Sequence, residues 1–176
     1  MSVLDQLKMK KLLIALLVLI SLPIVGNAQK INWMTFQEAV RLNETAPKKI
    51  FIDVYTDWCG WCKKMDQTTF RNAEVIDYMN ANYYAVKFDA EMNDTISFAG
   101  YTFVNEGGRN GRKGTHQLAA ALLQGRLSYP SYVFMNENNQ LLTVAPGYME
   151  PKDIMPILKY FGTDAYLNQT FKDYIK

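Results

Sequence analysis

The sequence predicts an α/β fold with a central mixed β-sheet flanked by helices on both faces. Apolar runs of strand length alternate along the chain with helix-length segments that carry recognisable caps. The run at residues 50–55 is apolar on both faces except for Asp53, which is typical of a central strand covered on its two sides. We therefore expect the order strand, helix, strand, helix, hairpin, helix.

Caps and turn residues set the expected limits of the elements. The expected elements are a short edge strand at 31–33, a helix at 35–45, the central strand at 50–55, helices at 59–70 and 72–82, a strand at 84–88, a helix at 115–123, hairpin strands at 132–135 and 141–145, and a helix at 151–161. Thr35 with Glu38 forms a capping box. Thr115 is expected to cap its helix, with His116 on the surface beside it.

Two segments are less regular. The stretch 90–114 has no clear period, and its glycine-rich part at 106–114 is expected to be a loop. Near the C-terminus, Leu167, Phe171 and Tyr174 fall at helical spacing, which predicts an added helix. With no repeat and no second domain visible in the sequence, residues 29–176 are expected to form one domain with this short helical extension.

Residues 1–28 have the pattern of a secretory signal peptide. Three lysines precede the apolar run 12–20, and the small-residue sequence Gly26-Asn27-Ala28 follows it. The run is too short to span about 30 Å of hydrocarbon. We expect cleavage after Ala28 and an exported, periplasmic domain that meets the membrane only through this peptide; an uncleaved anchor is the alternative.

The charge balance argues against nucleic acid as a ligand. The formal net charge of the whole chain is +2, and the predicted signal peptide accounts for it with three lysines and Asp5. A neutral domain lacks the basic surface that binds nucleic acid or an anionic membrane. The sequence also predicts no cofactor.

The chemistry is concentrated in one Cys-x-x-Cys pair that opens a helix. Cys59 and Cys62 are the only cysteines of the chain. A sulfur at a helix N-terminus faces backbone N–H groups and the positive end of the helix dipole, which favour the thiolate. Cys59 is therefore the predicted, more exposed nucleophile, and Cys62, one turn inward, the resolving thiol.

Other interpretations of the pair are weaker. A disulfide staple closing so short a loop contributes only about 2 kcal/mol. A metal site needs further soft ligands, and only His116 remains. Haem attachment requires histidine after Cys62, where Lys63 stands.

Asp53 is the second candidate residue. A carboxylate inside a buried strand has a raised pKa, because burial disfavours the charge. It is then a candidate proton acceptor for Cys62. The alternative is a carboxylate paired with a lysine or held by backbone groups.

These residues resemble a known family. The segment 53–63, Asp-Val-Tyr-Thr-Asp-Trp-Cys-Gly-Trp-Cys-Lys, is similar to the active-site segment of thioredoxins, and the resemblance covers roughly 31–162. Residues 65–72 look most like the C-terminal exported thioredoxin domain of DsbD-type electron transporters. The dipeptide Gly60-Trp61 is neither the Gly-Pro of thioredoxin nor the Pro-His of strong oxidants.

The resemblance implies a thioredoxin fold with an extended loop before a cis-proline, Pro130. It implies roles for Cys59 as nucleophile, Cys62 as resolving cysteine and Asp53 as the buried carboxylate. The neighbouring residues expected to contact substrate are Trp58, Gly60, Trp61 and Tyr129.

The predicted function is an exported thiol–disulfide oxidoreductase, acting as a reductant on disulfide-containing proteins. Without a transmembrane module of its own in this sequence, it is expected to take electrons from a membrane dithiol donor. The alternatives are a disulfide oxidase or isomerase, and a non-enzymatic thioredoxin-fold module that binds a partner or copper.

Overall fold

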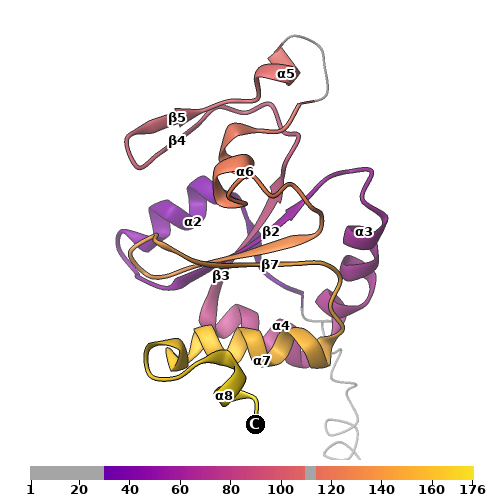
Figure 1. Ribbon diagram of the computed structural model, residues 1–176. Helices are drawn as coiled ribbons and strands as arrows, with labels where there is room; N and C mark the ends of the chain where they lie inside the picture. The colour runs from indigo at the N-terminus through magenta and orange to yellow at the C-terminus, as the bar shows by residue number, and fades with distance from the viewer. Residues whose placement is uncertain (1–29, 110–113) are drawn as a thin grey trace, which may run out of the picture.

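A five-stranded mixed sheet forms the centre of the protein. The computed structural model describes residues 30–109 and 114–176 (Figure 1), so the predicted signal peptide lies outside the described residues. The strand order is β1 (Trp33–Met34), β3 (Tyr83–Asp89), β2 (Lys49–Tyr55), β6 (Ser131–Met135) and β7 (Leu141–Pro146). Strands β1, β3 and β2 are parallel, whereas β6 and β7 run antiparallel to their neighbours. The predicted central position of the strand that carries Asp53 is confirmed.

Helices cover both faces of the sheet, as predicted. In Figure 1, α2 (Phe36–Asn43) and α6 (Gln117–Leu122) lie above the strands, and α4 (Ala73–Asn82) and α7 (Pro151–Gly162) lie below them. Successive residues of a strand point to opposite faces. Ile52 of β2 therefore joins the core with α2 and α6, and Phe51 joins the core with α4, α7 and α3 (Gly60–Gln67). Asp53 shares the face of Phe51.

Most predicted helix limits are set by the caps seen in the sequence. The Thr35 hydroxyl accepts from the Glu38 N–H at 3.2 Å, and the Glu38 carboxylate accepts from the Thr35 N–H at 2.8 Å. Asn72 caps α4 through its side-chain oxygen, which accepts from the Val75 N–H. A short 3-10 turn (Thr69–Arg71) separates α3 from α4. The edge strand begins two residues later than predicted.

The segment between β3 and α6 contains more structure than predicted. Strands β4 (Ile96–Phe98) and β5 (Tyr101–Phe103) form an antiparallel hairpin, followed by α5 (Glu106–Arg109). The predicted loop is therefore wrong at residues 106–109, and residues 110–113 lie outside the described part. The turn is made by Ala99 and Gly100, both at positive φ, as a type I′ hairpin turn requires. Ile96 anchors the hairpin because its side chain is buried in the main core.

His116, rather than Thr115, caps α6. Its Nδ1 accepts from the Leu118 N–H at 3.1 Å, and its Nε2 lies 2.9 Å from the carbonyl oxygen of Asp94. The ring is fully buried and packs edge-on against Phe88. The prediction of a surface histidine is wrong, because one ring nitrogen replaces the usual cap oxygen while the other fastens the segment after β3.

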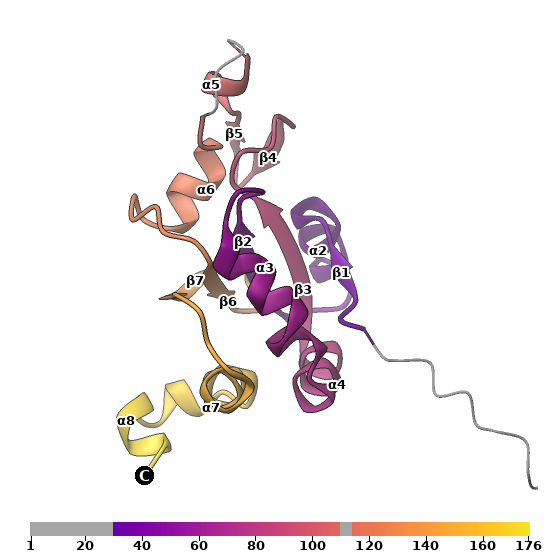
Figure 2. The same cartoon turned by 90° about the vertical axis from the view of Figure 1, so that its right-hand side faces the viewer.

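The C-terminal extension is two short turns instead of one helix. A 3-10 turn (Ala165–Leu167) precedes α8 (Phe171–Tyr174). Leu167 is 68% exposed and does not share the packing of Phe171 and Tyr174, whose rings each lie 5.3 Å from that of Tyr160. Figure 2 shows α8 at one end of the molecule and the β4–β5 hairpin with α5 at the other. Within the described residues, no helix combines the length and apolar character needed to cross a bilayer.

Candidate active site

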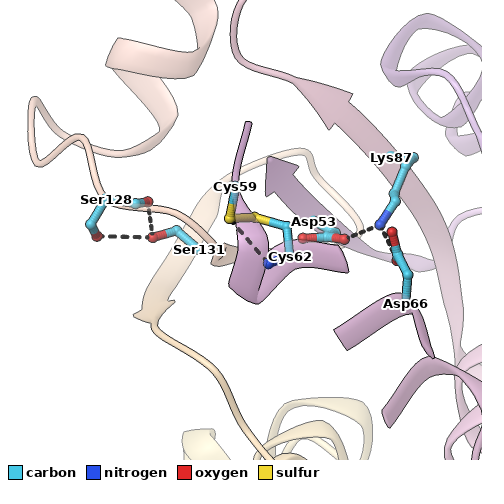
Figure 3. Close-up of a disulfide and its surroundings, with 7 residues drawn as sticks. All are labelled: Asp53, Cys59, Cys62, Asp66, Lys87, Ser128 and Ser131. Carbon is cyan, nitrogen blue, oxygen red and sulfur yellow. Dashed lines mark hydrogen bonds and ion pairs between the residues drawn. A yellow bond between two sulfur atoms is a disulfide. The ribbon is translucent and has the colours of Figure 1, made fainter. Parts of the chain in front are cut away.

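The two cysteines lie where the central strand gives way to α3. The Cys59 N–H donates to the Thr56 carbonyl at 3.1 Å, which closes the turn after β2. Cys59 is the N-cap residue of α3, and its Sγ accepts from the Cys62 N–H at 3.0 Å (Figure 3). The predicted placement of Cys59 at the helix N-terminus is thus present in the structure.

Cys59 and Cys62 are joined as a disulfide, with their Cα atoms 5.3 Å apart. Cys59 is 4% exposed and Cys62 2% exposed. The order of exposure agrees with the prediction, but the difference is small because both residues are enclosed in this oxidised state. An attacking thiolate therefore meets little exposed cysteine surface in the oxidised protein.

Asp53 is fully buried, but it is not alone. Its Oδ2 lies 2.5 Å from the Lys87 Nζ, and the same Nζ contacts the Asp66 Oδ1 at 2.5 Å. In Figure 3 the Asp53 carboxylate lies between Cys62 and Lys87. The lysine pairing weighed as the alternative is thus present. Burial is the main influence and raises the pKa of Asp53 to about 6; the Lys87 charge opposes this rise, and the Asp66 charge adds to it.

The sequence prediction missed Lys87 and Asp66. Lys87 is the register partner of Asp53 in the parallel β2–β3 pair, so aligning the two predicted strands could have found it. Asp66 lies one helical turn after Cys62, on the helix that covers this face. The three residues form a carboxylate–lysine–carboxylate row from the interior to the surface.

The outer end of this row opens into a cavity of about 740 Å³. The cavity is lined by Lys30, Ile31, Trp33, Asp66, Phe70, Arg71, Ile76 and Lys87. The ammonium of Lys87 lies 5.0–5.4 Å from the ring centres of Trp33, Tyr55 and Phe70, positions that favour cation–π attraction. Through Lys87 and Asp66, Asp53 is therefore connected to this cavity near strand β1.

Aromatic side chains surround the dithiol at the surface. Trp58 and Trp61 are 60% and 62% exposed. Trp58 packs edge-on against Tyr129 at 5.9 Å and donates through Nε1 to Glu91 at 2.9 Å. The ring centres of Trp61 and Tyr148 are 5.3 Å apart. Glu91 and Tyr148 were not singled out from the sequence, because they reach the site from distant segments.

The peptide bond between Tyr129 and Pro130 is cis, as the resemblance implied. The Pro130 carbonyl accepts from the Gly147 N–H at 2.8 Å. In the view of Figure 3, Ser128 and Ser131, which flank the cis peptide bond, lie on the Cys59 side of the disulfide; Ser131 begins β6. Gly60 is exposed at the first position of α3, with free space where a Cβ would lie. Among the described residues, no group of three or more histidine, cysteine, aspartate or glutamate side chains is arranged to hold a metal ion.

Comparison with known proteins places this site in a family. The family model Thioredox_DsbH, described as "Protein of unknown function, DUF255", matches residues 24–173. The chain belongs to this family. An uncharacterized protein of Archaeoglobus fulgidus is 30% identical over 64 residues, which are 36% of this chain and 50% of that protein. Spermatogenesis-associated protein 20 of Rattus norvegicus is 31% identical over 75 residues, 42% of this chain and 10% of that protein. The chain thus matches half or less of the length of these relatives.

Solved structures confirm the predicted thioredoxin fold. A thioredoxin-fold protein from Helicobacter pylori superposes with a TM-score of 0.58 at 16% identity, over 86% of this chain and 92% of that chain. A thioredoxin from Thermus thermophilus gives 0.54 at 13% identity, over 75% and 87% of the two chains. A putative disulphide-isomerase from Bacteroides thetaiotaomicron gives 0.53 at 22% identity, over 80% and 98%.

This Thioredox_DsbH protein is accordingly a Cys-x-x-Cys oxidoreductase-like protein of the thioredoxin fold. Its pair is placed for exchange, because the N–H group that stabilises charge points at Cys59, and in the view of Figure 3 the buried Asp53 carboxylate lies on the Cys62 side of the disulfide. The arrangement can stabilise a thiolate at the start of α3 and places a titratable carboxyl group, Asp53, in the buried layer below.

Proposed function

We propose that this protein reduces disulfides in exported protein substrates, with Cys59 as the attacking sulfur. The observation that carries the proposal is the position of the Cys59 Sγ at the start of α3, 3.0 Å from the Cys62 N–H. In the reduced protein this N–H and the helix dipole stabilise a Cys59 thiolate. The roles below follow from that charge.

The first step is attack of the Cys59 thiolate on one sulfur of a substrate disulfide. A bond forms between Cys59 and that sulfur, the substrate disulfide breaks, and the other substrate sulfur leaves as a thiolate. Trp58, Trp61, Tyr129 and Pro130 surround the dithiol and are proposed to contact the substrate around its cysteine. The exposed indole rings supply apolar area for an unfolded or extended segment.

The second step releases the substrate. Asp53 accepts the proton of the Cys62 thiol, and the Cys62 thiolate attacks Cys59, so that the reduced substrate departs. Two electrons have then passed from the two cysteines to the substrate, and the protein is left with the Cys59–Cys62 disulfide. With a pKa of about 6, Asp53 is largely ionised at pH 7 and able to accept this proton.

Continued turnover requires a reductant for the Cys59–Cys62 disulfide. We propose a membrane dithiol donor, because the pattern of residues 1–28 predicts export to the periplasm. That donor returns two electrons by the same exchange chemistry. Reaction in the opposite direction, as an oxidase or isomerase, uses the same two sulfurs and is separated by the redox potential.

The test is reduction of insulin disulfides by the dithiol form. Cys59→Ser is expected to lower the rate to the uncatalysed background. Cys62→Ser keeps the attacking sulfur but cannot release the substrate, so a mixed disulfide should accumulate and be visible as a mass adduct. A Cys59→Ser rate equal to wild type contradicts the proposal. Equilibration against glutathione then gives the direction: a potential well below that of glutathione supports a reductant.

A further inference from the structure

Asp53 has one oxygen that the ion pair does not explain. Its Oδ2 is held by Lys87, but its Oδ1 is buried and has no hydrogen-bond partner among the described residues. The hydroxyl oxygen of Tyr132 also lacks a hydrogen-bond partner in the described part of the chain, and the residue is fully buried. Buried polar atoms are seldom left unsatisfied, so two of them in one layer call for an explanation.

The two residues are neighbours across the sheet. Asp53 of β2 and Tyr132 of β6 are opposite one another in the antiparallel register. Side chains at such positions lie on the same face, with Cβ atoms roughly 4.5–5.5 Å apart. That face is the one covered by α3, which carries Cys62. Asp53 and Tyr132 therefore share one buried layer beneath the dithiol helix.

Packing accounts for the ring of Tyr132 but not for its hydroxyl. The ring stacks on Phe51 at 5.6 Å and meets Phe70 edge-on at 6.0 Å. A phenylalanine at this position would make both contacts; Phe134, two residues later on the same face, packs edge-on against the same Phe51 ring at 5.3 Å. An unsatisfied buried hydroxyl is unfavourable relative to phenylalanine. We therefore expect the hydroxyl to have a role other than core packing.

The electrostatics point to donation toward Asp53. Burial, followed by the negative charges of Asp53 and Asp66, raises the pKa of Tyr132, so its hydroxyl keeps its proton at neutral pH. A hydroxyl that keeps its proton can donate to an anion, and such a bond favours the ionised form of a carboxyl group. The titratable or charged groups around Asp53 are Tyr55, Cys62, Asp66, Lys87 and Tyr132, with Tyr148 beyond Tyr132.

We propose that Tyr132 is a positioning residue for the resolving step. Its hydroxyl donates to the Asp53 Oδ1 across one water molecule when that oxygen carries charge. The bond further favours the ionised form of Asp53, which is the form able to accept the Cys62 proton. This inference rests on the proposed function for its meaning in turnover, but the bond itself is present or absent in the resting protein.

The experiment titrates Asp53 in the oxidised protein, where the cysteines do not titrate, by the ¹³C shift of its carboxyl carbon. Tyr132→Phe is expected to move the midpoint upward by about one pH unit, the size of one hydrogen bond to a charged group. The matched control is Tyr83→Phe, which removes a buried hydroxyl bonded at 2.6 Å to the Leu158 carbonyl. It should cost stability without moving the Asp53 midpoint.

An Asp53 midpoint that stays in place in Tyr132→Phe, or that moves equally in Tyr83→Phe, overturns the inference. If Tyr132→Phe does not fold, the wild-type protein still decides: the ¹³Cζ shift of Tyr132 should change at the Asp53 midpoint, and the change should vanish in Asp53→Asn. A flat Tyr132 titration overturns the inference as well. None of these results depends on the insulin assay of Cys59→Ser, so failure here and failure of the proposed function remain distinguishable.

Discussion

Two lysines on neighbouring strands each contact two carboxylates, but burial is reversed in the two groups. Lys49 of β2 lies 2.6 Å from Glu137 and 2.8 Å from Asp164, and its side chain is 4% exposed while the carboxylates are 39% and 47% exposed. In the other group the acid is buried: the Asp53 side chain is 1% exposed, against 22% for Lys87. In the first group the base, Lys49, is shielded from water, and in the second group the acid, Asp53, is shielded.

This difference decides which group can change charge near neutral pH. Burial lowers the pKa of Lys49, but its hydrogen bonds to Asp164 and Glu137 outweigh burial and leave the pKa raised. Lys49 therefore stays charged and ties β2 to the β6–β7 turn and to the C-terminal extension. Burial raises the pKa of Asp53 to about 6, so this carboxylate, in the Lys87 group, can take up a proton near neutral pH. One arrangement is structural and the other suits proton transfer.

The largest expected difference comes from removing each lysine. Lys87→Met leaves Asp53 buried without a cation, which should cost on the order of 3 kcal/mol of unfolding free energy at pH 8. At pH 5 the carboxyl is protonated and the cost should fall below about 1 kcal/mol. Lys49→Met leaves two carboxylates that can turn to water, so about 1 kcal/mol is expected at both pH values. Urea unfolding of both variants and wild type measures this; equal losses for the two variants at pH 8 would contradict the comparison.

Comparison with Asp53→Asn should show that the buried Asp53 carboxyl lowers the stability of the wild-type protein, and more so at higher pH. The pKa of aspartate is about 3.9 in unfolded chains, and that of Asp53 is about 6 in the folded protein. The folded state therefore binds the proton more tightly, and wild-type stability should fall as pH rises from about 4 to 6 and then level off. The total fall is about 2–3 kcal/mol.

Asparagine does not titrate, so the variant should equal wild type near pH 4 and exceed it by about 2 kcal/mol at pH 8. Unfolding curves across this range provide the measurement. Release of substrate from the mixed disulfide should also be slower in Asp53→Asn than in wild type, because the proposed proton acceptor is gone. A variant less stable than wild type at pH 8 would show that the Lys87 pairing outweighs burial.

The parts of the molecule that the sequence predicts well are those fixed by near neighbours. The capping box of Thr35 and Glu38 spans four residues, and Cys59 reaches the start of α3 because a strand and a tight turn precede it. The burial of Asp53 follows from the apolar run around it. Each of these features depends on a local pattern, so each is visible in a single sequence.

The features that escaped prediction depend on distant contacts. Lys87 meets Asp53 across 34 positions and Asp66 across 21, so their meeting depends on strand register and helix placement. The β4–β5 hairpin has strands of three residues, too short to show a period, and it is held by Ile96 in the core. His116 was expected on the surface because it lies at a helix start, whereas the carbonyl of Asp94, 22 positions earlier, contacts its buried ring.

The smallest expected effects come from removing the charge of one exposed carboxylate in each group, Asp66 beside Lys87 or Asp164 beside Lys49. Asp66→Asn removes a negative charge near Asp53 and frees Lys87 to contact Asp53 alone; both changes favour the ionised form. The Asp53 midpoint should therefore move down by a few tenths of a pH unit, with a stability change within about 0.5 kcal/mol. Asp164→Asn is the matched control in the Lys49 group, with a similar small effect on stability and no effect on the Asp53 midpoint. An upward shift in Asp66→Asn would mean that Asp66 holds Lys87 in place for Asp53, and that the row from Asp53 to the cavity acts as one unit.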